Sequence, residues 1–290
     1  MNNLVIICAI LLLVLLFLKV PVYIAVLSAS AVYFIGTPGM NLSIFAQKTI
    51  SGAEGLSLLA IPFFVCAGIF MNYTGVTKRI MNCCEVLTAR MPGGLAQVNI
   101  LLSTLMGGLS GSSLADAAMQ CKMLVPTMES KGYSKSFSTV ITAASGMVVP
   151  LIPPGVGLII YGCINNISIG KLFIAGIGPG IVLCVTLMIF THFLSKKRGY
   201  LPSRTTKIPV SEKIAAVRPA FLPLLLPIII IGGVRIGVFT ASEAGTVAIV
   251  YAVLLGLLYK ELTLKNVMQG CKETVTTTAS IMLIVAAATC

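Results

Sequence analysis

Apolar stretches long enough to cross a lipid bilayer recur along this sequence from one end to the other. The chain is 57% hydrophobic and only 10% charged, whereas a soluble domain needs far more charge on its surface. A helix of roughly 17–25 apolar residues spans the hydrocarbon core. The sequence therefore predicts an all-α polytopic membrane protein, with spans at roughly 3–18, 21–37, 57–71, 136–165, 170–195, 219–237, 242–259 and 277–290.

The net charge of +12 is concentrated in one connection between two apolar spans. Seven of the twenty basic residues lie there: Lys196, Lys197, Arg198, Arg204, Lys207, Lys213 and Arg218. The positive-inside rule places such loops in the cytoplasm, where they face anionic lipid. We therefore expect contact with the lipid bilayer and no nucleic-acid partner. The nine cysteines form no CxxC pair and have no histidine at metal-ligand spacing, so no cofactor is expected.

Two of the predicted membrane segments are interrupted. The span at 136–165 contains VPLIPPG at 149–155, and its prolines prevent one continuous helix. The apolar segment at 93–120 carries GGLSGSS at 107–113, and its length and Gly/Ser centre favour a re-entrant helical hairpin. Unwound backbone at membrane depth is tolerated only where protein or a water-filled cavity surrounds it.

The charge pattern supports the hairpin. If 93–120 enters and leaves the membrane on one side, the strongly basic loops of the first two hundred residues share one face. These are the loop with Lys78, Arg79 and Arg90, the loop with Lys122, Lys131 and Lys135, and the connection at 196–218. A single crossing would split them between the two sides, contrary to the positive-inside rule.

The order of elements also repeats in inverted orientation. Residues 1–71 run helix, turn, helix, polar amphipathic stretch and helix, and residues 219–290 follow the same order. By the predicted topology one copy starts outside and the other inside, which is typical of secondary transporters. The first copy continues into a hairpin, a broken helix and a further span, so we expect the second repeat to be incomplete in this chain.

Asp116, the only aspartate, stands in GGLSGSSLADAA. An ionisable group at membrane depth is costly and usually lines a pathway or finds a partner, and its role here can also be to orient the hairpin. Glu243, in FTASEAG, instead has the pattern of a first-turn carboxylate behind an N-cap at Thr240 or Ser242, which is a structural role.

The hairpin tip is rich in groups that expose oxygen atoms. Ser110, Ser112 and Ser113 surround Gly111, and the facing element is the break at 145–155, whose prolines leave carbonyls unpaired. Two broken elements that meet near the midplane form a site where carbonyls hold Na⁺ and helix N-termini attract a carboxylate. The alternative for Gly and Ser in membrane helices is close packing alone.

Several motifs carry a family resemblance along nearly the whole chain. They are PFFVCAG at 62–68, MPGGLAQVNI at 91–100, GGLSGSSLADAA at 107–118, the VPLIPPG break with IIYG at 159–162, and FTASEAGTVAIVYA at 239–252. The sequence resembles the large membrane (permease) subunit of tripartite ATP-independent periplasmic (TRAP) transporters of the C4-dicarboxylate type.

The resemblance implies an elevator-type transporter of the bacterial inner membrane, with Na⁺ as the coupling ion. Its substrates would be small organic anions such as C4-dicarboxylates, sialic acids or other sugar acids. Its partners would be a small TRAP membrane subunit and a periplasmic substrate-binding protein. The segments would then be scaffold helices and arm at 1–56, the first transport half at 57–195, a cytoplasmic loop at 196–218, scaffold and arm at 219–276, and a truncated second transport half at 277–290.

The resemblance also assigns site residues. The first sodium site would use Ser110, Ser113, Ser145, Gly146, Val148 and Pro150, largely through backbone oxygens. The substrate and ion pathway would be lined by Ser110, Gly111, Ser112, Ser113, Asp116, Pro153, Pro154 and Gly155. Family members usually carry a serine after the proline pair, where this chain has Gly155, so a hydroxyl near the substrate is missing.

Two other functions share part of this pattern. GLSG at 108–111 matches the GxSG motif of rhomboid-type intramembrane serine proteases, and His192 is the only histidine that could act as the base. Rhomboids lack the inverted repeat and the proline break, so we do not expect an enzyme. A carrier of the wider ion-transporter group, working without a binding protein, shares the hairpins and the midplane site.

Overall fold

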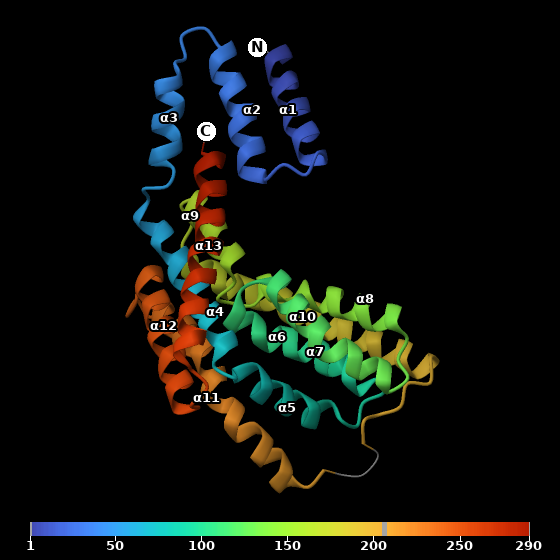
Figure 1. Ribbon diagram of the computed structural model, residues 1–290. Coiled ribbons are helices and arrows are strands. Elements are labelled where there is room, and N and C mark those ends of the chain that lie inside the picture. Colours follow the sequence, from blue (N-terminus) through green and yellow to red (C-terminus); the bar gives the residue numbers. More distant parts are fainter. Residues whose placement is uncertain (1, 205–207, 290) are drawn as a thin grey trace. The chain divides into compact units, whose positions relative to one another are not determined.

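The computed structural model describes residues 2–204 and 208–289, which form helices joined by short connections, with no β-strand in these ranges (Figure 1). The chain divides into two compact units, one of Met1–Leu59 with Glu273–Cys290 and one of Ala60–Lys272. Helix α13 (Leu264–Ala288) continues from the second unit into the first. The prediction of an all-α protein is confirmed.

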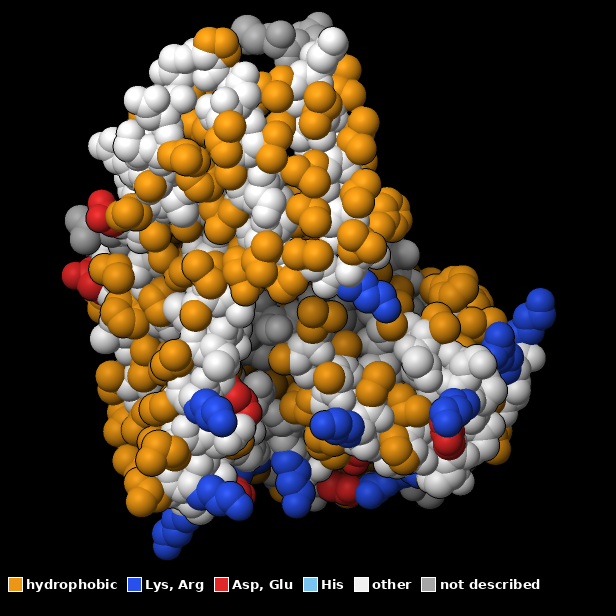
Figure 2. Space-filling model, turned by 45° about the horizontal axis from the view of Figure 1, so that its top comes forward, with side chains coloured by type: hydrophobic (Ala, Val, Ile, Leu, Met, Phe, Trp, Pro, Cys, Tyr) orange, Lys and Arg blue, Asp and Glu red, His pale blue; other side chains and the backbone are white. Residues whose placement is uncertain are grey.

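Apolar helices of membrane-spanning length dominate the structure. Within the described part of the chain, four helices are each long and apolar enough to cross a membrane: α10 (Ile169–Lys197), α11 (Val210–Arg235), α12 (Ala241–Leu258) and α13. Two further pairs of consecutive helices reach the same length and apolarity together, but each pair is bent at a break: Ala60–Tyr73 with Val76–Thr88, and Lys135–Leu151 with Val156–Ile164. Hydrophobic side chains also cover most of the surface seen in Figure 2. A surface of this kind suits lipid and confirms a polytopic membrane protein.

The first unit contains α1 (Asn2–Phe17), α2 (Val22–Gly36), α3 (Leu42–Ser51), a short 3-10 turn (Leu56–Leu59) and the end of α13. Helices α1 and α2 pack closely because Gly36 has no side chain: a Cβ there would lie 2.7 Å from Cδ1 of Leu4. The rings of Phe34 and Phe45, 5.7 Å apart, join α2 to α3.

The second unit is built around α4 (Ala60–Tyr73), which packs along α12. Gly245 allows this approach, since a Cβ at that position would lie 2.7 Å from Cβ of Phe63. The ring of Phe64 meets Phe173 of α10 edge to face at 6.1 Å. Helix α12 begins with a capping box, in which the Thr240 N–H donates to Glu243 (2.7 Å) and the Glu243 N–H donates to Thr240 Oγ1 (3.3 Å). The structural role predicted for Glu243 is therefore confirmed.

Three boundaries differ from the sequence-based expectation. The residues after the expected span at 57–71 form a helix, α5 (Val76–Thr88), that is bent by 70° from α4 at Gly75. Helix α11 begins at Val210, inside the segment expected to be a loop. The polar stretch after Leu262 and the final apolar segment are both part of the continuous helix α13. In each case polar residues occupy the exposed face or end of a helix whose other residues are apolar.

The three basic connections meet at one end of the second unit. The Gly93 N–H donates to the Tyr200 carbonyl (3.2 Å), the Arg204 N–H donates to the Ala89 carbonyl (2.9 Å), and the Ser134 N–H donates to the Tyr200 hydroxyl (3.1 Å). These bonds bring together the connections that follow α5, α7 (Ser113–Ser130) and α10. The ends of these connections therefore meet, whereas Lys78 and Arg79 lie at the start of α5 and Lys122 lies within α7. The shared membrane side of the basic loops stays a prediction.

The packing of α4 against α12 can be tested with a single methyl group. Gly245→Ala places a Cβ against Phe63 and should lower the free energy of unfolding by about 1–3 kcal/mol, because the two backbones must separate. The chain contains no tryptophan. Thermal unfolding in detergent is therefore measured with a thiol-reactive fluorophore that labels buried Cys83 and Cys84 as they become exposed.

Gly232→Ala is the matched control, because nothing lies within 4 Å of a Cβ at that helical position in α11. It should leave stability unchanged or raise it by about 0.5–1 kcal/mol. Equal midpoints for the two variants would contradict the close approach of α4 and α12.

Candidate ion and substrate site

A sharp turn connects the two helices of the hairpin. Helix α6 (Gly94–Ser110) ends at Gly111, whose φ of +62° is left-handed and favours glycine, and α7 begins at Ser113. Ser112 caps α7 by accepting a hydrogen bond from the Ala115 N–H at 3.4 Å. The two helices lie side by side in Figure 1 and are joined by the Gln120–Ser103 hydrogen bond. The Gly/Ser motif therefore forms a helix–turn–helix.

The element opposite the turn is a broken helix. Helix α8 (Lys135–Gly146) ends before a 3-10 turn (Val149–Leu151), and α9 (Val156–Ile164) begins after the extended residue Gly155. The two helical parts are bent by 43° relative to one another. The prolines cause the break, because they lack the N–H that a continuous helix requires.

Glycines bring the tip of the hairpin into direct contact with the break. A Cβ at Gly107 would lie 3.0 Å from Cα of Val149, and one at Gly108 would lie 2.8 Å from the Pro153 carbonyl oxygen. A Cβ at Gly111 would lie 3.3 Å from the Pro154 carbonyl oxygen. These are backbone contacts that a larger residue would open. The structure therefore brings together the two broken elements that we expected to face each other.

The residues assigned to the first sodium site are distributed around this contact. The carbonyl of Ser113 faces Gly146, at 3.4 Å from the position of a Cβ there. Ser110 is buried, and its hydroxyl has no hydrogen-bond partner among the described residues. Ser145 and Val148 are fully buried beside Gly146, whereas the Pro150 carbonyl points toward Gly155. The tip and the break therefore contribute oxygen atoms, but the Ser145 hydroxyl is already bound elsewhere.

Gly155, where the family resemblance leads us to expect a serine, is tightly enclosed. A Cβ there would lie 2.4 Å from the Pro150 carbonyl oxygen and 3.1 Å from its carbonyl carbon. The backbone in this chain folds back on itself so closely that only glycine fits. The local backbone conformation therefore leaves no room for a serine side chain at position 155.

A buried polar network links the hairpin to α8. Asn99 donates to Thr142 Oγ1 (2.6 Å) and accepts from the Ser145 hydroxyl (2.9 Å). Ser103 donates to Ser145 Oγ at 3.1 Å and accepts from the Gln120 amide at 2.7 Å. All five side chains are fully buried. Because each is bonded to another member, the hairpin and the first half of the broken helix are held together.

Asp116 belongs to the same network. It is 1% exposed and accepts a hydrogen bond from the Gln120 amide at 2.6 Å through Oδ2. Its second carboxylate oxygen and the Gln120 carbonyl oxygen are buried without a partner among the described residues. The carboxylate therefore ties the start of α7 to α6 through Gln120 and Ser103, and the structure does not place it in solvent.

Sequence reasoning missed Asn99, Ser103, Gln120 and Thr142. A signal for them exists, because polar residues recur at helical spacing on apolar helices, as in the pairs Asn99–Ser103 and Asp116–Gln120. Ser145 follows Thr142 by three residues in the same way. Each pair presents its side chains on one helix face, which is where the network forms.

The structure separates the serine and the histidine that a rhomboid-like protease would need as nucleophile and general base. The Gln97 amide donates to the Met188 carbonyl (2.9 Å), so the part of α10 that carries His192 lies beside the start of α6. Ser110 is at the other end of α6, roughly 20 Å away at the helical rise per residue. The His192 ring instead packs against Phe193. Ser110 and His192 cannot form a catalytic pair in this structure.

The geometry thus defines a class: a polytopic helical membrane protein in which a helical hairpin closes on a proline-broken helix. Residues 9–290 match the family described as tripartite ATP-independent periplasmic transporter, DctM component. This chain belongs to that family. It is a TRAP transporter large permease subunit, a multi-pass protein of the bacterial inner membrane.

Several curated relatives show the same membership. The sialic acid TRAP transporter large permease protein of Vibrio cholerae is 41% identical over 272 residues, which cover 93% of this chain and 63% of that protein. The 2,3-diketo-L-gulonate TRAP transporter large permease protein of Escherichia coli is 39% identical, covering 92% and 63%. The ectoine TRAP transporter large permease protein of Halomonas elongata is 36% identical, covering 94% and 64%. This chain therefore spans somewhat less than two thirds of the length of these relatives, which are permeases rather than enzymes.

The polar network makes a prediction about stability. Gln120→Met removes the amide that bonds both Asp116 and Ser103, and should cost about 1–3 kcal/mol because their buried oxygens lose a donor. Thermal unfolding in detergent is the measurement. Gln47→Met, at an exposed position of α3, is the control and should unfold at the wild-type temperature. A Gln120→Met variant as stable as the control would show that the network contributes nothing to the fold.

The crowding at Gly155 predicts that a serine is not tolerated at this position. Gly155→Ser should destabilise the protein by about 1–3 kcal/mol, because its Cβ overlaps the Pro150 carbonyl oxygen. Gly157→Ser is the matched control, since nothing lies within 4 Å of a Cβ at that position, two residues further along. If both variants unfold at the same temperature, the break has room for a side chain at position 155, and the predicted overlap with the Pro150 carbonyl is wrong.

Proposed function

We propose that this chain is the large transmembrane subunit of a Na⁺-coupled secondary transporter for small organic anions. The observation that carries the proposal is the contact between the hairpin tip and the proline break, together with the Ser110 hydroxyl at the end of α6, which is buried without a partner among the described residues. Irregular backbone at membrane depth that lines a polar site is the usual architecture for substrate and ion binding in secondary transporters.

The oxygen atoms around the tip fit a sodium ion. The Ser113 carbonyl faces Gly146, the Ser110 hydroxyl lacks a partner, and the prolines of the break supply carbonyls without matching N–H donors. Oxygen ligands of this kind suit a hard cation stripped of its water. Ser110, Ser113, Ser145, Gly146, Val148 and Pro150 are the residues that would hold the ion, mainly through their backbone.

The same contact offers a place for a carboxylate. The backbone nitrogen of Val156, at the start of α9, would lie 3.4 Å from a Cβ at Gly111, so the N-terminal ends of α7 and α9 are close together. The N-cap of α9, Gly155, provides no side chain to satisfy the first N–H groups of that helix. Helix N-termini attract anions. Ser112, Asp116, Pro153 and Pro154 would border this pathway.

The relatives support the substrate class. The proteins from Vibrio cholerae and Escherichia coli are named for sialic acid and for 2,3-diketo-L-gulonate, and both compounds are acids with a carboxylate. We infer that this chain also works with a small membrane subunit and with a periplasmic protein that delivers the substrate. Movement of the hairpin and the broken helix as one body, in an elevator mechanism, would carry the site across the membrane.

Sodium binding can be tested on the chain itself, because the proposed site lies within the hairpin and the break. Na⁺ should raise the thermal unfolding midpoint relative to choline at equal ionic strength. The stabilisation should be about 1.4 kcal/mol at ten times the dissociation constant. Ser110→Ala combined with Ser113→Ala should reduce this shift, because two hydroxyl oxygens at the hairpin tip are lost.

Ser136→Ala, at an exposed position in the first turn of α8, is the control and should keep the full Na⁺ response. If Na⁺ and choline act alike on the wild-type chain, the proposed coupling ion is wrong. If the double variant responds to Na⁺ like the wild type, the ion binds elsewhere.

A further inference from the structure

A basic pocket lies at the end of the second unit where the three connections meet. It has a volume of about 410 Å³ and is lined by Lys131, Gly132 and Tyr133 on one side and by the segment 198–203 on the other. The lining contains two cationic side chains, Lys131 and Arg198, and no acidic one. An opening of this size with only positive charge favours an anionic ligand.

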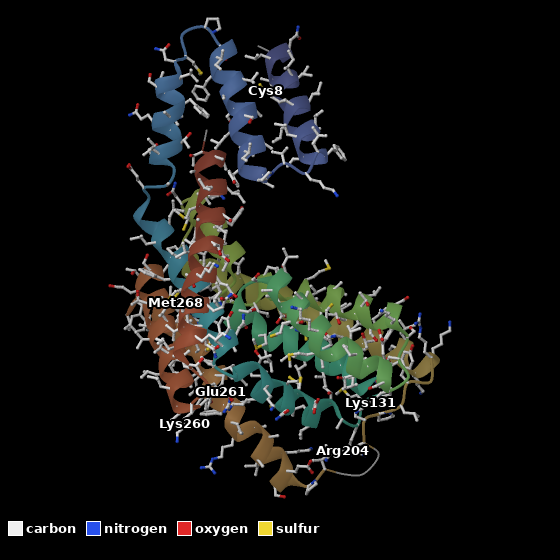
Figure 3. All side chains as sticks on the ribbon, viewed as in Figure 1. Cys8, Lys131, Arg204, Lys260, Glu261 and Met268 are labelled. Carbon is white, nitrogen blue, oxygen red and sulfur yellow. The ribbon has the colours of Figure 1, made fainter. Side chains whose placement is uncertain are left out.

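The cations of the pocket are free to bind a ligand. Arg198 makes one long hydrogen bond to the Ser134 hydroxyl (3.5 Å) and lies 5.3 Å from the centre of the Phe137 ring, so most of its donors remain available. Neither Lys131 nor Arg198 forms an ion pair with a described carboxylate. Arg204 differs from them, because it is already paired with Glu212. Figure 3 shows Lys131 and Arg204 at the same end of the unit.

The acidic residues near the pocket do not line it. Glu129 precedes Lys131 by two residues, and its backbone carbonyl accepts a hydrogen bond from the Gly132 N–H (3.0 Å). Glu85 lines a neighbouring pocket together with Lys131 and Arg204, but it does not line this one. The hydrogen bonds between Tyr200 and Ser134 are the main cause that lowers the pKa of the Tyr200 hydroxyl below its usual range, and the nearby Arg198 contributes less. The first turn of α8, which starts beside Ser134, contains no acidic residue. Its N-terminus adds to the positive potential.

Two tyrosines, Tyr133 and Tyr200, line the pocket, and Phe137 packs beside them without lining it. The Tyr133 and Tyr200 rings stack with centroids 4.4 Å apart, and Phe137 lies 5.1 Å from Tyr200. The pocket directly follows Lys197, the last residue of the candidate span α10. Stacked tyrosines at the end of a span are typical of the membrane–water interface, where their rings reach the level of lipid headgroups. The pocket therefore combines positive charge, an apolar wall and an interfacial position.

We propose that this pocket binds the phosphate headgroup of an anionic phospholipid of the inner membrane. Arg198 bonds the phosphate through its planar guanidinium, Lys131 adds a second charge, and the Tyr133–Tyr200 stack contacts the glycerol and upper acyl region. The lipid bridges the connection between α7 and α8 and the connection after α10. This site is a defined binding pocket and is distinct from a general attraction of basic loops to the membrane.

The test is native mass spectrometry of the full chain in detergent, titrated with phosphatidylglycerol and, in parallel, with phosphatidylcholine. Wild-type protein should retain one phosphatidylglycerol more tightly than phosphatidylcholine. Lys131→Gln with Arg198→Gln should weaken this binding by roughly tenfold or more, since each basic group near the surface contributes substantially. Lys196→Gln with Lys197→Gln removes the same charge from exposed positions that do not line the pocket, and should retain the lipid.

Two further arms keep the result interpretable. Lys131→Arg with Arg198→Lys preserves the charge and should recover most of the binding that the glutamine pair loses, although the missing guanidinium at position 198 keeps it below the wild type. Inorganic phosphate, added alone and as a competitor, tests whether the ligand is a soluble anion. The proposal is overturned if both charge-removing pairs lose the lipid equally, if phosphatidylcholine binds as well as phosphatidylglycerol, or if free phosphate displaces the lipid at comparable concentration.

Discussion

The structure of the second unit depends on a contact between backbones, in which the tip of one hairpin presses against the break in another helix. The hairpin side of this contact consists of Gly107, Gly108 and Gly111. The hairpin also packs against Gly68 of α4, where the Ser110 carbonyl oxygen lies 2.6 Å from the position that a Cβ would occupy. The backbones of the two irregular segments approach each other beside the side chains of Ile152 and Val156. In lipid, such segments are stable only when protein encloses them, so the glycines are what permits both to exist at membrane depth.

The network from Asn99 to Asp116 fixes the position of this contact. It crosses from α6 to α7 and to α8 through hydrogen bonds between buried side chains. Hydrogen bonds inside an apolar bundle have no competing water, so a network that is mostly satisfied specifies one arrangement of the helices. The tip and the break therefore keep their register while the surrounding helices contribute mainly apolar packing.

Much of this architecture could be predicted from the sequence, because its causes are local. The closely spaced prolines at 150, 153 and 154 interrupt a helix, whereas the single prolines Pro126 and Pro179 lie inside the continuous helices α7 and α10. A Gly/Ser cluster in the middle of an apolar segment likewise indicates a turn. The capping box at Thr240 and Glu243 likewise needs only three residues of spacing. The helix α5 was missed because its apolar residues, such as Val76, Ile80 and Cys84, are separated by charged ones, and its burial comes from contact with α11. The partners Asn99 and Thr142 lie on different helices, and no local pattern pairs them.

The proline break has a further consequence in the balance of hydrogen-bond donors and acceptors. Three of the seven residues at 149–155 are prolines, so every residue of the segment has a carbonyl but only four have an N–H. The carbonyl oxygens of Pro150, Leu151, Pro153 and Pro154 are directed toward glycines. The polarity of this region is thus a property of the main chain. An alanine scan would identify the surrounding glycines as the sensitive positions and would pass over the oxygens, because exchanging a side chain leaves each carbonyl in place.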